Sequence, residues 1–154
     1  MKRQVYISVN ARLAKELLEK HDAACIILKN NEIIFTHAGI GVKPLIAFME
    51  KPLEERSGDL VLVDKVIGKA ALLMAVKLGI RNIYTPLVSE EALDAATVHG
   101  VIIEALETVP YIINRTNDGK CPLEQSVTGI YDPEEAFVKI KQAIAELMKK
   151  IVTL

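Results

Sequence analysis

The sequence predicts a single α/β domain over residues 1–154, built as a three-layer α-β-α sandwich around a mixed five-stranded sheet. Three observations support this prediction. Segments with helical spacing of apolar residues alternate with short aliphatic runs. The middle of the chain reads strand–helix–strand–helix–strand, which implies parallel strands joined by right-handed crossovers. A hairpin signal precedes that unit and adds an antiparallel pair.

The first part of the chain predicts a helix, a hairpin and a second helix. Residues 10–20 have helical spacing, and an asparagine at their start suits an N-cap. The apolar runs 23–28 and 32–36 are joined by a turn with two asparagines, which tolerate the left-handed conformation that a hairpin needs. A proline in the first turn predicts a helix over residues 44–49.

The middle of the chain predicts the parallel part of the sheet. Residues 60–63 form a continuous aliphatic run, typical of a strand that is buried on both faces. We expect an aspartate cap to start a helix over 64–78 and a serine cap to start another over 89–99, each followed by a glycine stop. Strands are expected over 80–85, which ends before a proline, and over 101–106.

The last part of the chain predicts an apolar segment, a loop and a closing helix. The segment covers residues 109–114 and the polar loop covers 115–122. Asp132 and Pro133 are typical of a helix start, and the helix is expected to reach about Ile151 with a charged outer face.

Composition excludes several classes of function. The net charge of −1 disfavours a strong phosphate-backbone binder, and a chain with no Trp, three Phe and four Tyr lacks a stacking platform, so no nucleic-acid polymer is expected as a partner. There is no apolar run of 18 residues, so no membrane span is expected. The first residues lead into a mixed stretch and not a signal-peptide core, which makes the cytoplasm the expected compartment.

In open α/β sheets, ligands bind beyond the carboxyl ends of the parallel strands. Helix starts at Asp64 and Ser89 would direct free backbone N–H groups to that edge, and Lys65 and Lys69 would add positive charge. These residues predict a site for a small anionic or strongly polar molecule. The alternative is purely structural: both helix starts are ordinary caps, and the lysines are solvated surface. Gly68 costs helix stability, which indicates close packing or close approach of a ligand.

The chain resembles a known family over most of its length. The segments that carry the resemblance are Gly41-Val42-Lys43-Pro44-Leu45, Val63-Asp64-Lys65-Val66-Ile67-Gly68-Lys69-Ala70-Ala71, Leu87-Val88-Ser89-Glu90-Glu91-Ala92, Asn114-Arg115 and Cys121-Pro122-Leu123-Glu124-Gln125. They resemble the bacterial family of uncharacterised proteins known as DUF1893. The element order is also similar to the cytidine-deaminase-like fold, in which two helix starts face one pocket.

The resemblance to zinc deaminases implies where their motifs would fall. The first motif, His-Ala-Glu, would align with Asp64-Lys65-Val66, which replaces the proton-shuttling Glu by Val66. The second, Pro-Cys-x-x-Cys, would align with residues 86–90, which places Leu87 and Glu90 at the two cysteine positions. Leucine has no ligand atom, so the resemblance implies a deaminase-like domain without zinc, and neither a metal nor another cofactor is expected.

Cys121 is the candidate nucleophile. It lies in a polar loop beside Lys120 and close to Arg115, and positive neighbours raise the thiolate fraction of a cysteine. The structural alternative is a loop cysteine that packs under Pro122. Cys25, in contrast, lies within an apolar run and is expected to be a small buried side chain.

Neither cysteine has a CxxC partner, and the three histidines show no metal-binding spacing. Of the histidines, His37 alone is expected to approach a pocket, because it follows a strand close to Gly39.

Three functional hypotheses remain open at this stage. The first is a deaminase-like domain that binds a small polar or nucleotide-like ligand at Asp64 and Ser89, with Lys69, Asn114 and Arg115 as further ligand-binding residues. The second is a zinc-independent enzyme that uses Asp64, Lys65 or Lys69, and Cys121 as acid, base and nucleophile. The third is a non-catalytic regulatory or interaction module that works as a homo-oligomer.

Overall fold

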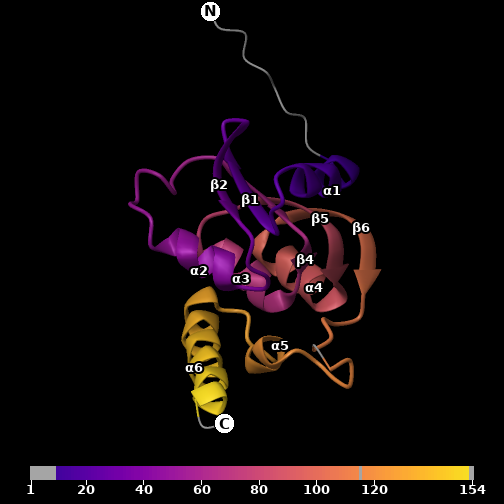
Figure 1. Cartoon of the computed structure of the whole chain (residues 1–154), viewed down its shortest axis with the longest axis vertical. Helices are drawn as coiled ribbons and strands as arrows, with labels where there is room; N and C mark the ends of the chain where they lie inside the picture. Colours follow the sequence, from indigo (N-terminus) through magenta and orange to yellow (C-terminus); the bar gives the residue numbers. More distant parts are fainter. Residues whose placement is uncertain (1–9, 115, 153–154) are drawn as a thin grey trace, which may run out of the picture.

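A six-stranded mixed sheet lies at the centre of the protein in the computed structural model, which describes residues 10–114 and 116–152 (Figure 1). Its strands are β1 Cys25–Lys29, β2 Glu32–His37, β3 Leu60–Asp64, β4 Val66–Ile67, β5 Asn82–Ser89 and β6 Ile102–Val109. The helices are α1 Ala11–Lys20, α2 Lys43–Met49, α3 Lys69–Lys77, α4 Glu90–His99, α5 Pro122–Ser126 and α6 Pro133–Val152. The order of the predicted elements is confirmed, and the mixed α/β class with it.

The predicted count of five strands is wrong by one, because the short strand β4 was not expected; β3 and β4 follow one another along the same neighbour, β5. Residues 61–63 pair with residues 82–84 of β5, and residues 66–67 pair with residues 87–88 further along β5. The other edge of β5 pairs in parallel with β6, and β1 pairs antiparallel with both β2 and β3. The predicted combination of a parallel unit and an antiparallel hairpin is therefore confirmed.

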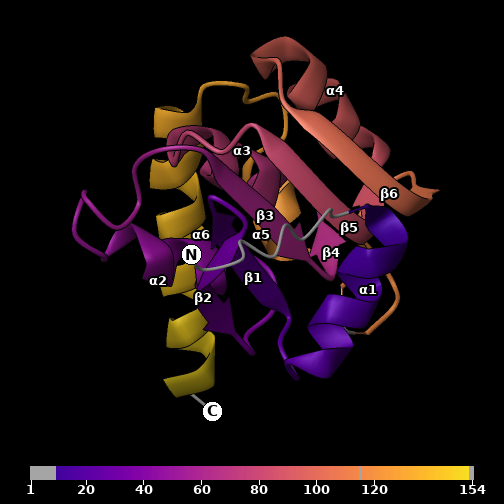
Figure 2. The ribbon, with the colours of Figure 1, turned by 90° about the horizontal axis from the view of Figure 1, so that it is seen from above.

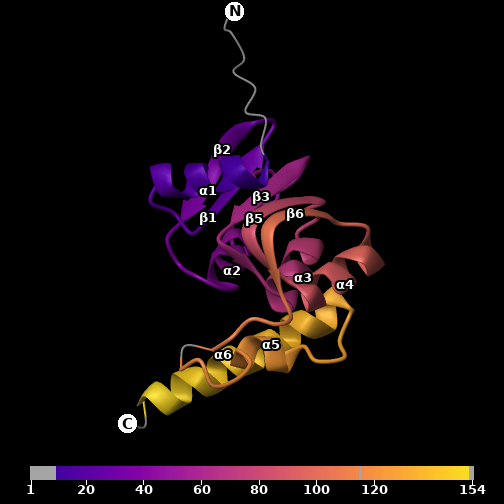
Figure 3. The same cartoon turned by 90° about the vertical axis from the view of Figure 1, so that its right-hand side faces the viewer.

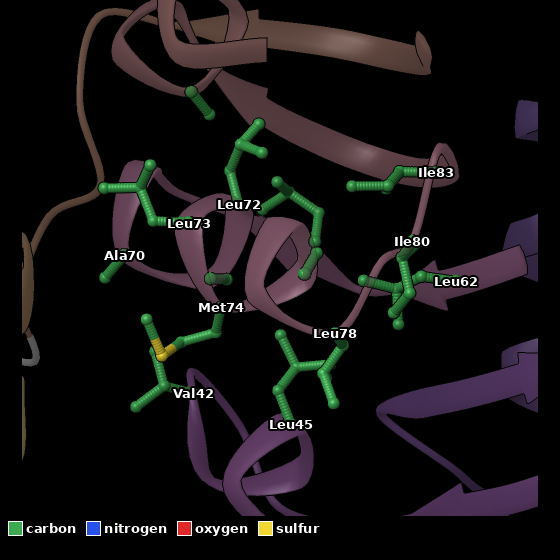
Figure 4. Packing of buried hydrophobic residues seen from close by; sticks show 14 of the residues in the cluster. Val42, Leu45, Leu62, Ala70, Leu72, Leu73, Met74, Leu78, Ile80 and Ile83 are labelled. Atoms are coloured by element: carbon green, nitrogen blue, oxygen red, sulfur yellow. The ribbon is translucent and has the colours of Figure 1, made fainter. Parts of the chain in front are cut away.

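Helices pack against both faces of the sheet (Figure 2). On one face, Ala14 and Leu18 of α1 contact Ile26, Leu28 and Val63 in a small buried cluster. The larger cluster fills the other face, where α2, α3, α4 and α6 pack. Figure 4 shows part of this cluster, with residues 70–74 of α3 between Leu45 on one side and Ile83 on the other. Residues 70–75 of α3 are all buried at its centre, so this helix is surrounded by protein. Alternate residues of each central strand therefore face two different cores.

The predicted helix start at Asp64 is wrong. Asp64 is the last residue of β3, Lys65 interrupts the strand, and pairing resumes at Val66 and Ile67 before α3 begins at Lys69. Asp64 Oδ1 accepts a hydrogen bond from the backbone N–H of Val66 at 3.2 Å, which holds the chain at this interruption. Val66 and Ile67 are β-branched and fit the strand beside β5 better than the first turn of a helix.

Two other boundaries differ from the prediction. Strand β5 continues through Pro86 to Ser89, although a proline was expected to end it. Pro86 itself has no partner in the β5–β6 register, and the hydroxyl of Thr85 accepts a hydrogen bond from the N–H of Leu87 at 3.2 Å. Pairing between β5 and β6 is therefore interrupted only at the proline and resumes at Leu87. The short helix α5 was not predicted.

The end of α6 extends beyond the body of the domain, with α5 beside it (Figure 3). Within residues 10–114 and 116–152, none of the helices combines the length and the apolar character that a bilayer crossing requires.

Candidate functional site

Three chemically reactive side chains form a row across the ends of three strands. Cys25 of β1 pairs with His37 of β2 on one side and with Asp64 of β3 on the other. Residues that lie directly opposite one another in neighbouring strands point to the same face of the sheet. The row His37–Cys25–Asp64 therefore faces the larger core, and we call it the polar row. Asp64 and His37 are candidates from the sequence alone, but nothing in the sequence predicts that either lies beside Cys25.

Asp64 is almost completely buried, with 3% of its surface exposed. Its Oδ1 accepts the Val66 N–H, but Oδ2 is buried with no hydrogen-bond partner among the residues that the structure describes. Burial raises the pKa of the Asp64 carboxyl to about 8, and the backbone N–H groups of Val66 and Lys65 oppose that shift only in part. At pH 7 the carboxyl is therefore mostly protonated and neutral.

Cys25 is fully buried beside this carboxyl. Burial raises the pKa of its thiol, and the negative charge that Asp64 carries when it is ionised raises that pKa further. A thiol that resists ionisation is a poor nucleophile. The structure thus supports the predicted character of Cys25 as a small buried side chain.

His37 forms the half-buried end of the polar row. Its Nδ1 accepts a hydrogen bond from the Gly39 N–H at 2.8 Å, so the neutral ring carries its proton on Nε2. A Cβ at Gly39 would lie 2.7 Å from Cε1 of the ring, which means that only glycine allows this contact. The ring also stacks on Phe35, with 6.0 Å between the ring centroids. These contacts fix the orientation of the imidazole.

The helix start that the sequence predicted as an anion site exists at Gly68 and Lys69, but the protein fills it itself. Both carboxylate oxygens of Glu124 accept from the N–H of Ala70, each at 3.3 Å. A Cβ at Gly68 would overlap the carboxylate of Glu124, which explains the glycine. Burial raises the pKa of Glu124, while the N–H groups of Ala70 and Lys69 favour its ionised form. The carboxylate of Glu124, a residue of α5, therefore caps the start of α3.

Lys69 is also engaged inside the protein. Its Nζ donates to the carbonyl of Val127 at 3.0 Å and lies 4.2 Å from the centre of the Tyr131 ring. Its side chain is buried, and desolvation lowers its pKa. Close by, Lys120 and Glu91 form an ion pair of 2.8 Å, which links the loop before α5 to the first turn of α4. This cluster joins α5 to the starts of two helices.

Most of the other predicted ligand-binding residues have structural partners. Ser89 Oγ accepts from the Ala92 N–H at 3.1 Å, which confirms it as the cap of α4. The side chain of Asn114 donates to Asp118 at 2.8 Å and closes the loop that follows. Arg115 lies outside the described residues.

The predicted catalytic residues are not joined by contacts. Lys65 is exposed and lines a groove of about 250 Å³ with Lys15, Leu18, Glu19 and Pro86, on the α1 side of the sheet. Asp64 points to the opposite face. Within the described residues, the side chain of Asp64 forms no hydrogen bond or ion pair with the side chain of Lys65, Lys69 or Cys121.

Cys121 is half-exposed at the residue before α5, where its N–H donates to the carbonyl of Ile112 at 2.9 Å. No group of three potential metal ligands occurs in residues 10–114 and 116–152. The placement of the first zinc motif on Asp64, Lys65 and Val66 also assumed a helix start that lies at Lys69 instead.

The fold defines a mixed α/β domain whose polar groups gather at the carboxyl ends of its parallel strands. The chain belongs to the family described as TM1506, domain of unknown function (DUF1893), whose model matches residues 13–144. Among solved structures, a DUF1893 family protein (TM1506) from Thermotoga maritima superposes with a TM-score of 0.73 at 23% sequence identity, covering 95% of this chain and 97% of that one. That likeness shows the fold alone. No curated protein matches the sequence.

Proposed function

We propose that this domain binds a small molecule through the carboxyl group of Asp64, which the fold holds in its protonated form. The observation that carries the proposal is the second carboxyl oxygen of Asp64, which is buried and has no hydrogen-bond partner within the described residues. Buried polar atoms are nearly always paired, and an unpaired one requires an explanation such as a bound ligand or water. The ligand would supply the missing partner.

The protonation state of Asp64 defines the chemistry of the ligand. A protonated carboxyl donates one hydrogen bond, so the ligand presents an acceptor such as a carbonyl oxygen, a ring nitrogen or a phosphate oxygen. Carboxylic acids that an apolar site keeps neutral serve as hydrogen-bond donors in other proteins. Nucleobases carry acceptors of this kind, which keeps a nucleotide-like ligand within the proposal.

The position of Asp64 supports this assignment. It lies at the carboxyl end of a parallel strand, where open α/β sheets bind ligands. The half-buried His37 adds an Nε2–H donor at the accessible end of the polar row, with Cys25 between the two. The proposal includes a fold assignment: we propose that this is a deaminase-like domain without zinc chemistry. The order of the hairpin and the strand–helix units supports that assignment.

The experiment is a thermal-shift screen of nucleosides, nucleotides, inorganic phosphate and small carboxylic acids against three proteins. Asp64→Asn keeps a neutral donor and the acceptor for the Val66 N–H, whereas Asp64→Val removes both. We expect the same compounds to stabilise the wild type and Asp64→Asn, and none to stabilise Asp64→Val. Cys25→Ala is the matched control, because it changes the neighbouring core position and leaves the donor in place.

The amide signals of Val66 and Gly39 in NMR spectra give a second readout, since both N–H groups contact the polar row. A compound that binds as proposed shifts both signals in the wild type. If none of the compounds stabilises the wild type at millimolar concentration, or if Asp64→Val binds as well as the wild type, the proposal is wrong.

A further inference from the structure

Helix α6 presents a surface that the site described above does not use. With Pro122 and Ser126 of α5, its side chains line a groove of about 350 Å³, the α5–α6 groove. From α6, the lining includes Lys139, Gln142, Ala143, Glu146 and Leu147. The helix continues beyond the body of the domain, with α5 beside it (Figure 3).

The charges on this face of α6 alternate in a particular order. Glu135, Lys139, Glu146 and Lys150 are spaced by four, seven and four residues, so they share one helix face. Their signs read negative, positive, negative, positive along the helix. The uncharged residues Gln142 and Ala143 lie at the centre of the series.

The order of charges along α6 is complementary to the same order read in the opposite direction. If a second helix of the same sequence runs antiparallel and crosses at Gln142 and Ala143, Lys139 lies opposite Glu146 of the second copy. By the two-fold symmetry of such a contact, Glu146 lies opposite Lys139 of the second copy. A parallel arrangement would instead place like charges side by side.

We propose that the α5–α6 groove is the interface of an antiparallel two-fold dimer, and that its occupant is helix α6 of a second copy of this chain. Ala143 at the crossing lets the two helices approach closely, and Leu147 and Pro122 supply apolar contact around it. Exposed ion pairs add little affinity, so the charges mainly set the orientation and the choice of partner. The inference is independent of ligand binding at Asp64.

The test is a charge-swap experiment in sedimentation equilibrium, with a mass of 17.0 kDa for the monomer. In a Lys139→Glu dimer, both symmetry-related pairs become Glu opposite Glu, and in a Glu146→Lys dimer both become Lys opposite Lys. We expect each variant alone to dissociate at concentrations where the wild type is a dimer. A mixture of the two variants restores both opposite-charge pairs, so we expect it to form a heterodimer.

Two controls separate this result from damage to the helix. Lys141→Glu makes the same change two residues along α6, on another face, and is expected to remain a dimer. Circular dichroism checks that each variant keeps its helix content. The inference is overturned if the wild type is monomeric up to about 1 mM, if the single variants dimerise like the wild type, or if the mixture fails to associate.

Discussion

The protonated state of Asp64 makes a quantitative prediction about stability and pH. The pKa of this carboxyl is about 8 in the folded protein, and an unfolded aspartate titrates near 3.9. The contribution of Asp64 to the free energy of unfolding is therefore most favourable below about pH 4 and becomes less favourable as the pH rises towards 8. The reason is that the unfolded chain releases a proton that the folded protein keeps. The slope is about 1.4 kcal/mol per pH unit, so Asp64 costs about 4 kcal/mol between pH 4 and pH 7.

Asp64→Asn isolates this effect. The amide is neutral at every pH and keeps an acceptor for the Val66 N–H, so we expect the variant to lack the loss of stability caused by Asp64. Other groups, including Glu124 with its raised pKa, titrate in both proteins and cancel in the difference between them. The assay is urea unfolding at pH 4, 5.5, 7 and 8.5, followed by circular dichroism. Parallel stability curves for the two proteins would refute the reasoning.

Three further predictions follow from the packing. Gly68→Ala should cost about 1–3 kcal/mol because its methyl group overlaps Glu124, and the cost should shrink in a Glu124→Ala background, measured by a double-mutant cycle of urea unfolding. Ser89→Ala removes the cap of α4 and should cost about 1 kcal/mol in the same assay, whereas an unchanged midpoint would show that the cap contributes nothing. In the native protein a thiol reagent should modify the half-exposed Cys121 and leave the buried Cys25 intact until denaturant is added; native modification of both would contradict the structure.

The hairpin and the closing helix were predictable because their signals are local. Asn30 and Asn31 adopt positive φ values of 52° and 65°, which is the conformation that their residue type allows in a tight turn. The side chain of Asp132 accepts from the Glu134 N–H, as the helix-start signal implied. In these segments the neighbouring residues alone determine the structure.

The start of α3 was not predictable, because its determinants are distant in sequence. Asp64 has the residue type of a cap, but pairing of Val66 and Ile67 with β5 decides that the strand continues. Glu124, which caps α3 from 54 positions away, carries no local signal of that role. The one available indication was Gly68, whose cost to helix stability pointed to close packing or to close approach of a ligand.

The polar row was hidden for a related reason. Each of its members belongs to a different strand, and only the registers of β1 with β2 and of β1 with β3 bring them together. The residues next to Cys25 in the sequence are apolar, so nothing local indicates that it lies beside a carboxyl group. Strand pairing, which depends on tertiary packing, creates this site.

The same packing also narrows the class of ligand. The positive end of α3 and the amine of Lys69 are the groups that would attract an anion, and the protein satisfies them with Glu124 and the carbonyl of Val127. A free anion would have to displace a buried carboxylate, whereas a neutral acceptor that reaches the buried Asp64 Oδ2 would meet an oxygen with no hydrogen-bond partner among the described residues. Among the compounds tested, uncharged nucleosides should therefore stabilise the protein at least as well as inorganic phosphate does, and a preference for phosphate that persists in Asp64→Val would place the binding elsewhere.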